Sequence, residues 1–174
     1  MTQPPTDDEF AELVHACWAS LYRTAYLLLG DPVEAEDLVQ TALAKTYANW
    51  RKVRSVDAAP GYARTTLVNT ASSWFRKKGW RNERPTDVLP EVARASGLET
   101  DLDDRRTVID ALSTLPPRQR AVVVLRYYED LSVAQVAHAL GITEGTVKSQ
   151  TSEALSKLRA LLGDSVIPAG ANHD

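Results

Sequence analysis

The chain has 174 residues, of which 44% are hydrophobic and 25% charged, and its formal net charge is −3. This length fits one or two small domains, and the balance is that of an ordinary soluble globular protein. Its single cysteine, Cys17, excludes an internal disulfide and a cysteine-based metal site. The polar N-terminus and the absence of a long apolar stretch predict a cytoplasmic protein without membrane insertion.

The first half of the chain has the pattern of amphipathic helices. Apolar residues recur at three- and four-residue spacing, and Gly30 ends the first such run. Asp31 followed by Pro32 is typical of a helix start, because an acceptor side chain precedes a proline at the first helical position. The predicted helices cover 7–29, 32–50 and 60–78, with a polar loop over 51–59.

The segment 81–104 has no sustained period. It contains Pro85, Pro90 and Gly97 and ends in an acidic run, so it is predicted to be a flexible linker. Helical periodicity returns over 108–115, 118–128, 133–140 and 144–162, and no strand pattern is found. The predicted class is all-α, with two small helical domains. The predicted boundaries are a first domain over 7–84, an acidic linker over 85–106, a second domain over 107–163 and a flexible tail over 164–174.

The segment 131–149 has the spacing of a helix-turn-helix. Ala137 is small enough for two helices to approach, Gly141 can adopt the left-handed turn conformation, and Val147 can lock the second helix onto the first. Thr143 is a predicted N-cap for that second helix. In this geometry the early residues of the second helix face the DNA major groove. The predicted DNA-contacting residues are Thr146, Lys148, Ser149, Ser152 and Glu153.

A second signal is the mixture of basic and aromatic residues over 73–84. Phosphates attract the charges, and aromatic faces can stack on unpaired bases. Burial in the core is the better interpretation for Trp74 and Phe75. Nucleic acid is favoured for the five basic residues of the segment, which are Arg76, Lys77, Lys78, Arg81 and Arg84.

Two other classes of function remain open from the residues alone. One is an ordinary helix-turn-helix regulator with a helical sensor domain, which would bind duplex DNA by itself, often as a dimer. The other is an enzyme. The sequence has no phosphate-binding glycine loop, no metal-ligand spacing and no nucleophile–base motif. We therefore expect no catalytic residues, no metal and no cofactor.

Together, the two halves resemble the extracytoplasmic-function (ECF, group 4) sigma factors of bacterial RNA polymerase, in the sigma-70 superfamily. The resemblance covers about 9–84, similar to region two, and 107–162, similar to region four. Its motifs are EAEDLVQT at 34–41, YARTTLVNT at 62–70, DALSTLPPRQR at 110–120 and YYEDLS at 127–132. VKSQT at 147–151, with Trp74-Phe75, is similar to a subgroup frequent in actinobacteria.

The resemblance implies a function: binding core RNA polymerase, recognising the minus-ten and minus-thirty-five promoter elements, and promoting DNA opening. Asn69 matches a position that holds a flipped minus-ten base, and the loop 52–59 matches the loop that captures it. The implied minus-ten set is Arg64, Asn69, Arg76, Lys77 and Lys78. The implied polymerase-binding set is Glu36, Asp37, Leu38, Val39 and Gln40.

The implied partners are core RNA polymerase, through the clamp of its beta-prime subunit and its beta flap, promoter DNA, and an anti-sigma factor as a further candidate. The sequence departs from the family pattern at two positions. Many relatives have an aspartate where Ser73 stands, and many have a basic residue where Glu153 stands. A glutamate accepts a hydrogen bond from cytosine but does not pair with phosphate, so a different minus-thirty-five preference is expected.

Overall fold

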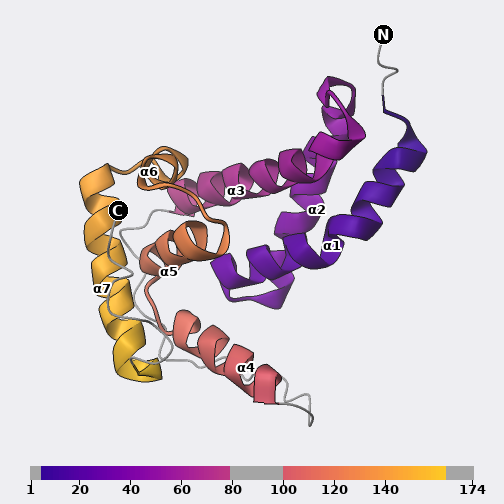
Figure 1. The fold of residues 1–174 in the computed structure, drawn as a ribbon. Coiled ribbons are helices and arrows are strands. Elements are labelled where there is room, and N and C mark those ends of the chain that lie inside the picture. Colours follow the sequence, from indigo (N-terminus) through magenta and orange to yellow (C-terminus); the bar gives the residue numbers. More distant parts are fainter. Residues whose placement is uncertain (1–4, 79–99, 164–174) are drawn as a thin grey trace. The chain divides into compact units, whose positions relative to one another are not determined.

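The computed structural model describes residues 5–78 and 100–163, which form two separate helical units divided after Lys78 (Figure 1). The described residues contain α-helices, short 3-10 turns and one π-helical turn, and no strand. The predicted all-α class with two helical domains is therefore confirmed. The predicted linker up to residue 99 and the tail 164–174 lie outside the described residues.

The first unit is a three-helix bundle. Its helices are α1 (Asp7–Leu29), α2 (Pro32–Ala48) and α3 (Ala59–Lys78), and each packs against the other two. Thr6 and Glu9 form a capping box at the start of α1, and Gly30 ends that helix with a φ of 71°. The Asp31 carboxylate accepts hydrogen bonds from the amides of Val33 and Glu34, as the predicted cap requires.

Within residues 100–163, the second unit consists of four α-helices and the π-helical turn. They are α4 (Thr100–Ser113), α5 (Pro117–Val123), η4 (Val124–Tyr128), α6 (Val133–Leu140) and α7 (Glu144–Leu162). Helices α4, α5 and α6 all pack against α7. The core includes Val122, Val136, Leu140 and Val147, which have almost no exposed surface.

Several predicted boundaries differ from the structure. Helix α2 ends at Ala48, two residues earlier than predicted, and α3 begins one residue earlier, at Ala59. Helix α4 begins at Thr100, inside the segment predicted to be an acidic linker. Acidic residues suit the first turns of a helix because its N-terminal end is positive, so the run Asp101 to Asp104 fits a helix as well as a linker.

The predicted helix over 118–128 is also not a single α-helix. It widens into a π turn after Val123, where the amide of Glu129 donates to the carbonyl of Val124. The turn ends at Asp130, whose φ is 56°, and the guanidinium of Arg126 closes it by donating to the carbonyl of Leu131 over 2.7 Å. These contacts come from residues beyond the helix, so its periodicity could not indicate them.

Candidate nucleic-acid interface

The turn between α6 and α7 has the geometry of a helix-turn-helix. Gly141 has φ 65° and ψ 36°, a left-handed conformation that a side chain disfavours. The amide of Ile142 donates to the carbonyl of Ala137 over 3.0 Å and closes the turn. Ala137 and Val147 are both buried. The three positions singled out from the sequence therefore have the environments that a helix-turn-helix requires.

The start of α7 is fixed by its own side chains. The hydroxyl of Thr143 accepts a hydrogen bond from the amide of Thr146, and the two threonine hydroxyls lie 2.9 Å apart. Thr143 is thus the N-cap that the sequence predicted. Thr146, which was predicted to contact DNA, is half-buried and has its hydroxyl in the cap. Its first role in the structure is to begin the helix.

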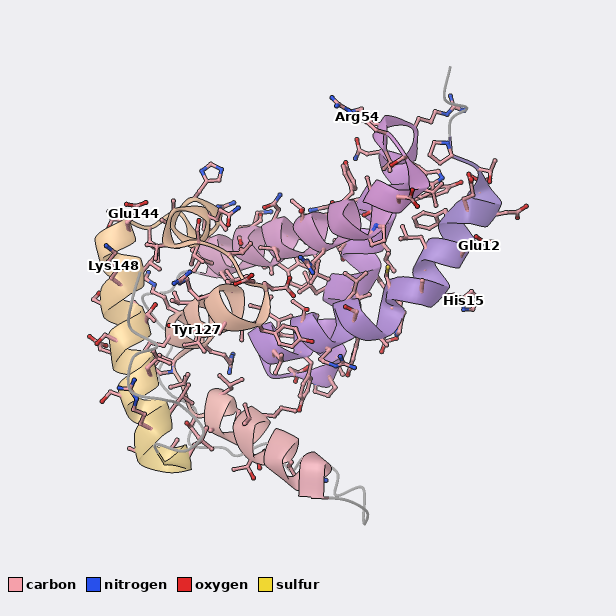
Figure 2. The ribbon with its side chains drawn as sticks, in the orientation of Figure 1. Glu12, His15, Arg54, Tyr127, Glu144 and Lys148 are labelled. Carbon is pink, nitrogen blue, oxygen red and sulfur yellow. The ribbon has the colours of Figure 1, made fainter. Side chains whose placement is uncertain are left out.

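The other four predicted DNA-contacting residues are exposed on α7, and Figure 2 shows Lys148 with Glu144 on its first turns. Residues three or four positions apart lie on the same side of a helix. Ser149 and Ser152 therefore share a face, and the same spacing adds Gly145 and Ser156, which are also exposed. Sequence reasoning missed these two, although the spacing was visible. The face is made of small residues, with Lys148 and Glu153 beside them.

Glu153 is held by a residue from another helix. Its carboxylate accepts a hydrogen bond of 3.0 Å from the side-chain amide of Gln119, which lies in α5. The amide oxygen of Gln119 in turn accepts a hydrogen bond of 3.1 Å from the ammonium of Lys157. Neither Gln119 nor Lys157 was singled out from the sequence, because no local pattern links positions 34 and 38 residues apart.

Helix α3 carries the predicted minus-ten residues. Arg64, Asn69, Arg76 and Lys77 are all exposed, and the side chain of Lys78 lies outside the described residues. Asn69 and Arg76 are two turns apart and share a face, whereas Arg64 lies on a different side of the helix. Phe75 is buried and Trp74 half-buried, in agreement with the core interpretation of these two aromatics.

The segment before α3 is tied to the N-terminus of the chain. The indole N–H of Trp50 donates to the carbonyl of Thr6 over 2.8 Å, and Trp50 packs edge-on against Phe10. Val53 and Ala59 are buried beside Trp50, which leaves the residues between them exposed at the surface. The predicted base-capture loop is therefore a short exposed segment with both ends fixed in the core.

The polymerase-binding set predicted on α2 divides into two groups. Glu36, Asp37 and Gln40 are exposed, and the Gln40 amide donates to the Glu36 carboxylate over 3.3 Å. Leu38 and Val39 are 0% exposed. Their prediction as partner-contacting residues is wrong, because both side chains lie in the core of the first unit. Their apolar character reflects packing, and only the polar flank remains available.

The chemistry of the described residues is that of binding surfaces. No group of three or more His, Cys, Asp or Glu side chains in this part of the chain could hold a metal ion. Burial raises the pKa of the Cys17 thiol. The hydrogen bond from Tyr47 to the Asp7 carboxylate, and the charge of that carboxylate, raise the pKa of the tyrosine. Among the helices described, none is both long and apolar enough to span a bilayer.

The fold and its exposed helix face define a helical DNA-binding protein with a helix-turn-helix. Residues 13–81 match the family model Sigma-70 region 2, and residues 111–160 match Sigma-70, region 4. The chain is 42% identical over 151 residues to RNA polymerase sigma-E factor of Streptomyces coelicolor. The aligned region covers 87% of this chain and 84% of that protein.

It is 34% identical over 151 residues to ECF RNA polymerase sigma factor SigL of Mycobacterium tuberculosis, which covers 83% of each chain. The structure is similar to that of the sigma factor RpoE from Bartonella quintana, solved in complex with the anti-sigma factor NepR. The TM-score is 0.58, with 25% sequence identity, over 92% of this chain and 98% of that one.

The chain belongs to the ECF sigma factors of bacterial RNA polymerase. The resemblance inferred from the sequence motifs is thereby confirmed. Its relatives are sigma factors, which are not enzymes, and promoter recognition in transcription initiation is the function that this membership gives the chain.

Proposed function

We propose that the second unit reads the minus-thirty-five element through the exposed face of α7. The observation that carries this proposal is the location of that face directly after the helix-turn-helix turn. Ser149 and Ser152 are short enough to let the helix backbone approach base edges, with Lys148 beside them as a donor and Glu153 as an acceptor. The proposed domain, region four, covers 107–163.

A promoter library randomised across the minus-thirty-five element tests this assignment. Transcription by polymerase carrying the wild type is compared with alanine variants at Lys148, Ser149, Ser152 and Glu153. A side chain that reads a base should relax the preference at one position, at a cost of about 1–3 kcal/mol. A lysine that contacts phosphate should weaken all sequences alike and reduce the salt slope by about one. Identical base preferences for the wild type and all four variants would contradict the proposal that α7 reads the minus-thirty-five element.

The first unit, proposed as region two over 7–84, meets the minus-ten element through α3. Asn69 and the exposed loop that precedes α3 are the proposed site for an extruded base, and Arg76 and Lys77 face the duplex phosphates. Extruding a base costs stacking and pairing energy, and a pocket that accepts the base lowers that cost. The chain therefore promotes opening by binding, and no catalytic step is assigned to it.

The proposed contact with core RNA polymerase is the exposed flank of α2. Glu36, Asp37 and Gln40 present polar groups to the clamp of the beta-prime subunit, and the second unit is proposed to meet the beta flap. An anti-sigma factor is a further proposed partner, supported by the Bartonella relative that was solved with NepR.

A core-binding pull-down tests the α2 contact. The double variant Asp37→Lys, Gln40→Lys should lose core binding while keeping its helical circular dichroism. The matched control is Glu12→Lys, His15→Lys, which also replaces one carboxylate and one neutral side chain, on the exposed surface of α1 (Figure 2). Equal core binding by the two double variants would contradict the clamp assignment.

A further inference from the structure

The side chain of Gln119 connects two helices of the second unit. It is only 4% exposed, and it lies in the first turn of α5. Its amide nitrogen donates to Glu153 and its amide oxygen accepts from Lys157, both of which are exposed residues of α7 one turn apart. A buried amide thus holds two charged side chains that stand at the edge of the proposed reading face.

The two hydrogen bonds that link Glu153, Gln119 and Lys157 form a bridge between α5 and α7. Only one orientation of the Gln119 amide can make both of them. An amide nitrogen has protons to donate to a carboxylate, and an amide oxygen has lone pairs to accept from an ammonium. Rotating the amide by half a turn would place acceptor against acceptor and donor against donor. Because Gln119 is buried, water cannot readily replace either partner, and leaving a buried polar group unpaired is costly. The bridge therefore fixes the position of the Glu153 carboxylate.

We propose that Gln119 is a positioning residue for minus-thirty-five recognition, although it does not itself touch DNA. This inference rests on the proposed function of Glu153 as a base-reading residue. Gln119 occupies part of the hydrogen-bonding capacity of the carboxylate, and the remaining lone pairs are left for a base donor such as the cytosine amino group. A side chain that is already oriented loses less freedom when it binds. Base preference at that position then depends on a residue of another helix.

A structural role alone predicts a different outcome. If Gln119 only packs α5 against α7, its replacement by leucine would loosen the unit and weaken all promoters alike. If Gln119 positions Glu153, the replacement would change the preference at one promoter position. Thr151→Val is the control for loosened packing. Thr151 lies in α7 and, like Gln119, is a buried polar residue. Its hydroxyl bonds only within its own helix, to the carbonyl of Val147.

The test uses holoenzyme reconstituted from core polymerase and the full chain, on the promoter library randomised across the minus-thirty-five element. Glu153→Ala should lower the preference at one position by about fivefold or more. Gln119→Leu should lower the preference at the same position by a similar factor. The double variant Gln119→Leu, Glu153→Ala should lose no more of that preference than either single variant does. Thr151→Val should leave the preference at every position unchanged.

Two results would overturn the inference in distinguishable ways. If Glu153→Ala changes one position and Gln119→Leu changes none, Gln119 is not a positioning residue, while the proposed function of Glu153 stands. If neither variant changes any position, both proposals fail. Should Gln119→Leu not fold, Gln119→Glu replaces it, because a carboxylate there keeps the attraction to Lys157 and repels Glu153. A folded Gln119→Glu protein with wild-type preferences would also overturn the inference.

Discussion

The two helices proposed to face DNA both contain serine and threonine residues, which differ in how far they are buried. In α3, the hydroxyls of Thr66, Thr70 and Ser72 donate to carbonyls four residues earlier, over 2.7–2.8 Å, and Thr70 and Ser72 are buried. In α7, Thr151 is likewise buried and bonded to the carbonyl of Val147. Ser149 donates to the carbonyl of Thr146 over 3.1 Å, but Ser149 and Ser152 are exposed. Hydroxyls bond to carbonyls of their own helix in both cases, and the serines of the proposed reading face of α7 are exposed. The comparison teaches that burial, more than residue type, decides which polar residue is available to a partner.

Shortening a core leucine in each unit should have the largest effect. Leu67 of α3 and Leu140 of α6 are both almost fully buried. Replacing either one with alanine should destabilise its own unit by about 2–5 kcal/mol, because a cavity adds to the lost transfer free energy. Hydrogen exchange followed peptide by peptide measures the two units separately. Equal loss of protection in both units from a single substitution would show that they unfold together.

Alanine substitutions at two glycines, one in each unit, are expected to have opposite effects on stability. Gly141→Ala places a side chain at a φ of 65° and should destabilise the second unit by about 1–2 kcal/mol. Gly61→Ala, near the start of α3, adds a Cβ with nothing within 4 Å and should stabilise the first unit by up to about 1 kcal/mol. Denaturant unfolding monitored for each unit checks both signs. A Gly141→Ala protein as stable as the wild type would contradict the left-handed turn at that position.

The helix caps offer a matched pair of smaller changes. Asp31→Ala removes the cap of α2, and Thr143→Ala removes the cap of α7. Each should cost about 1 kcal/mol of stability. Only the second substitution disturbs the start of the proposed reading helix, so only Thr143→Ala should lower transcription from a promoter with an intact minus-thirty-five element. A comparable loss from Asp31→Ala would mean that stability, and not recognition, limits activity.

The smallest expected effect is at Gly145. A Cβ at this position would meet only the Thr143 hydroxyl, at 3.9 Å, so folding does not require a glycine. Gly145→Ala should raise the melting temperature slightly, with a stability gain below about 1 kcal/mol. If the face of α7 lies against base edges, the added methyl should also weaken promoter binding. An alanine variant that is more stable and equally active would place Gly145 away from the DNA.

Local patterns predicted most of the helices. Helices α1, α6 and α7 have the predicted limits because periodicity, caps and the glycines at 30 and 141 all act within a few residues. Two kinds of feature escaped prediction. The π turn depends on contacts with Glu129 and Leu131. The early start of α4 lies in an acidic run of the sequence, which suits a helix start as well as a linker.

The sequence alone determined the class of the protein, the helix-turn-helix and the family, because these follow from short-range spacing and ordered motifs. The tertiary structure decided which residues of each motif are accessible. It placed Leu38 and Val39 in a core, where the sequence could not separate a packed apolar residue from a contacting one. It also joined Gln119 to Glu153 across 34 positions. Hydrogen bonds between residues far apart in the chain arise only when helices pack, so no local pattern specifies them.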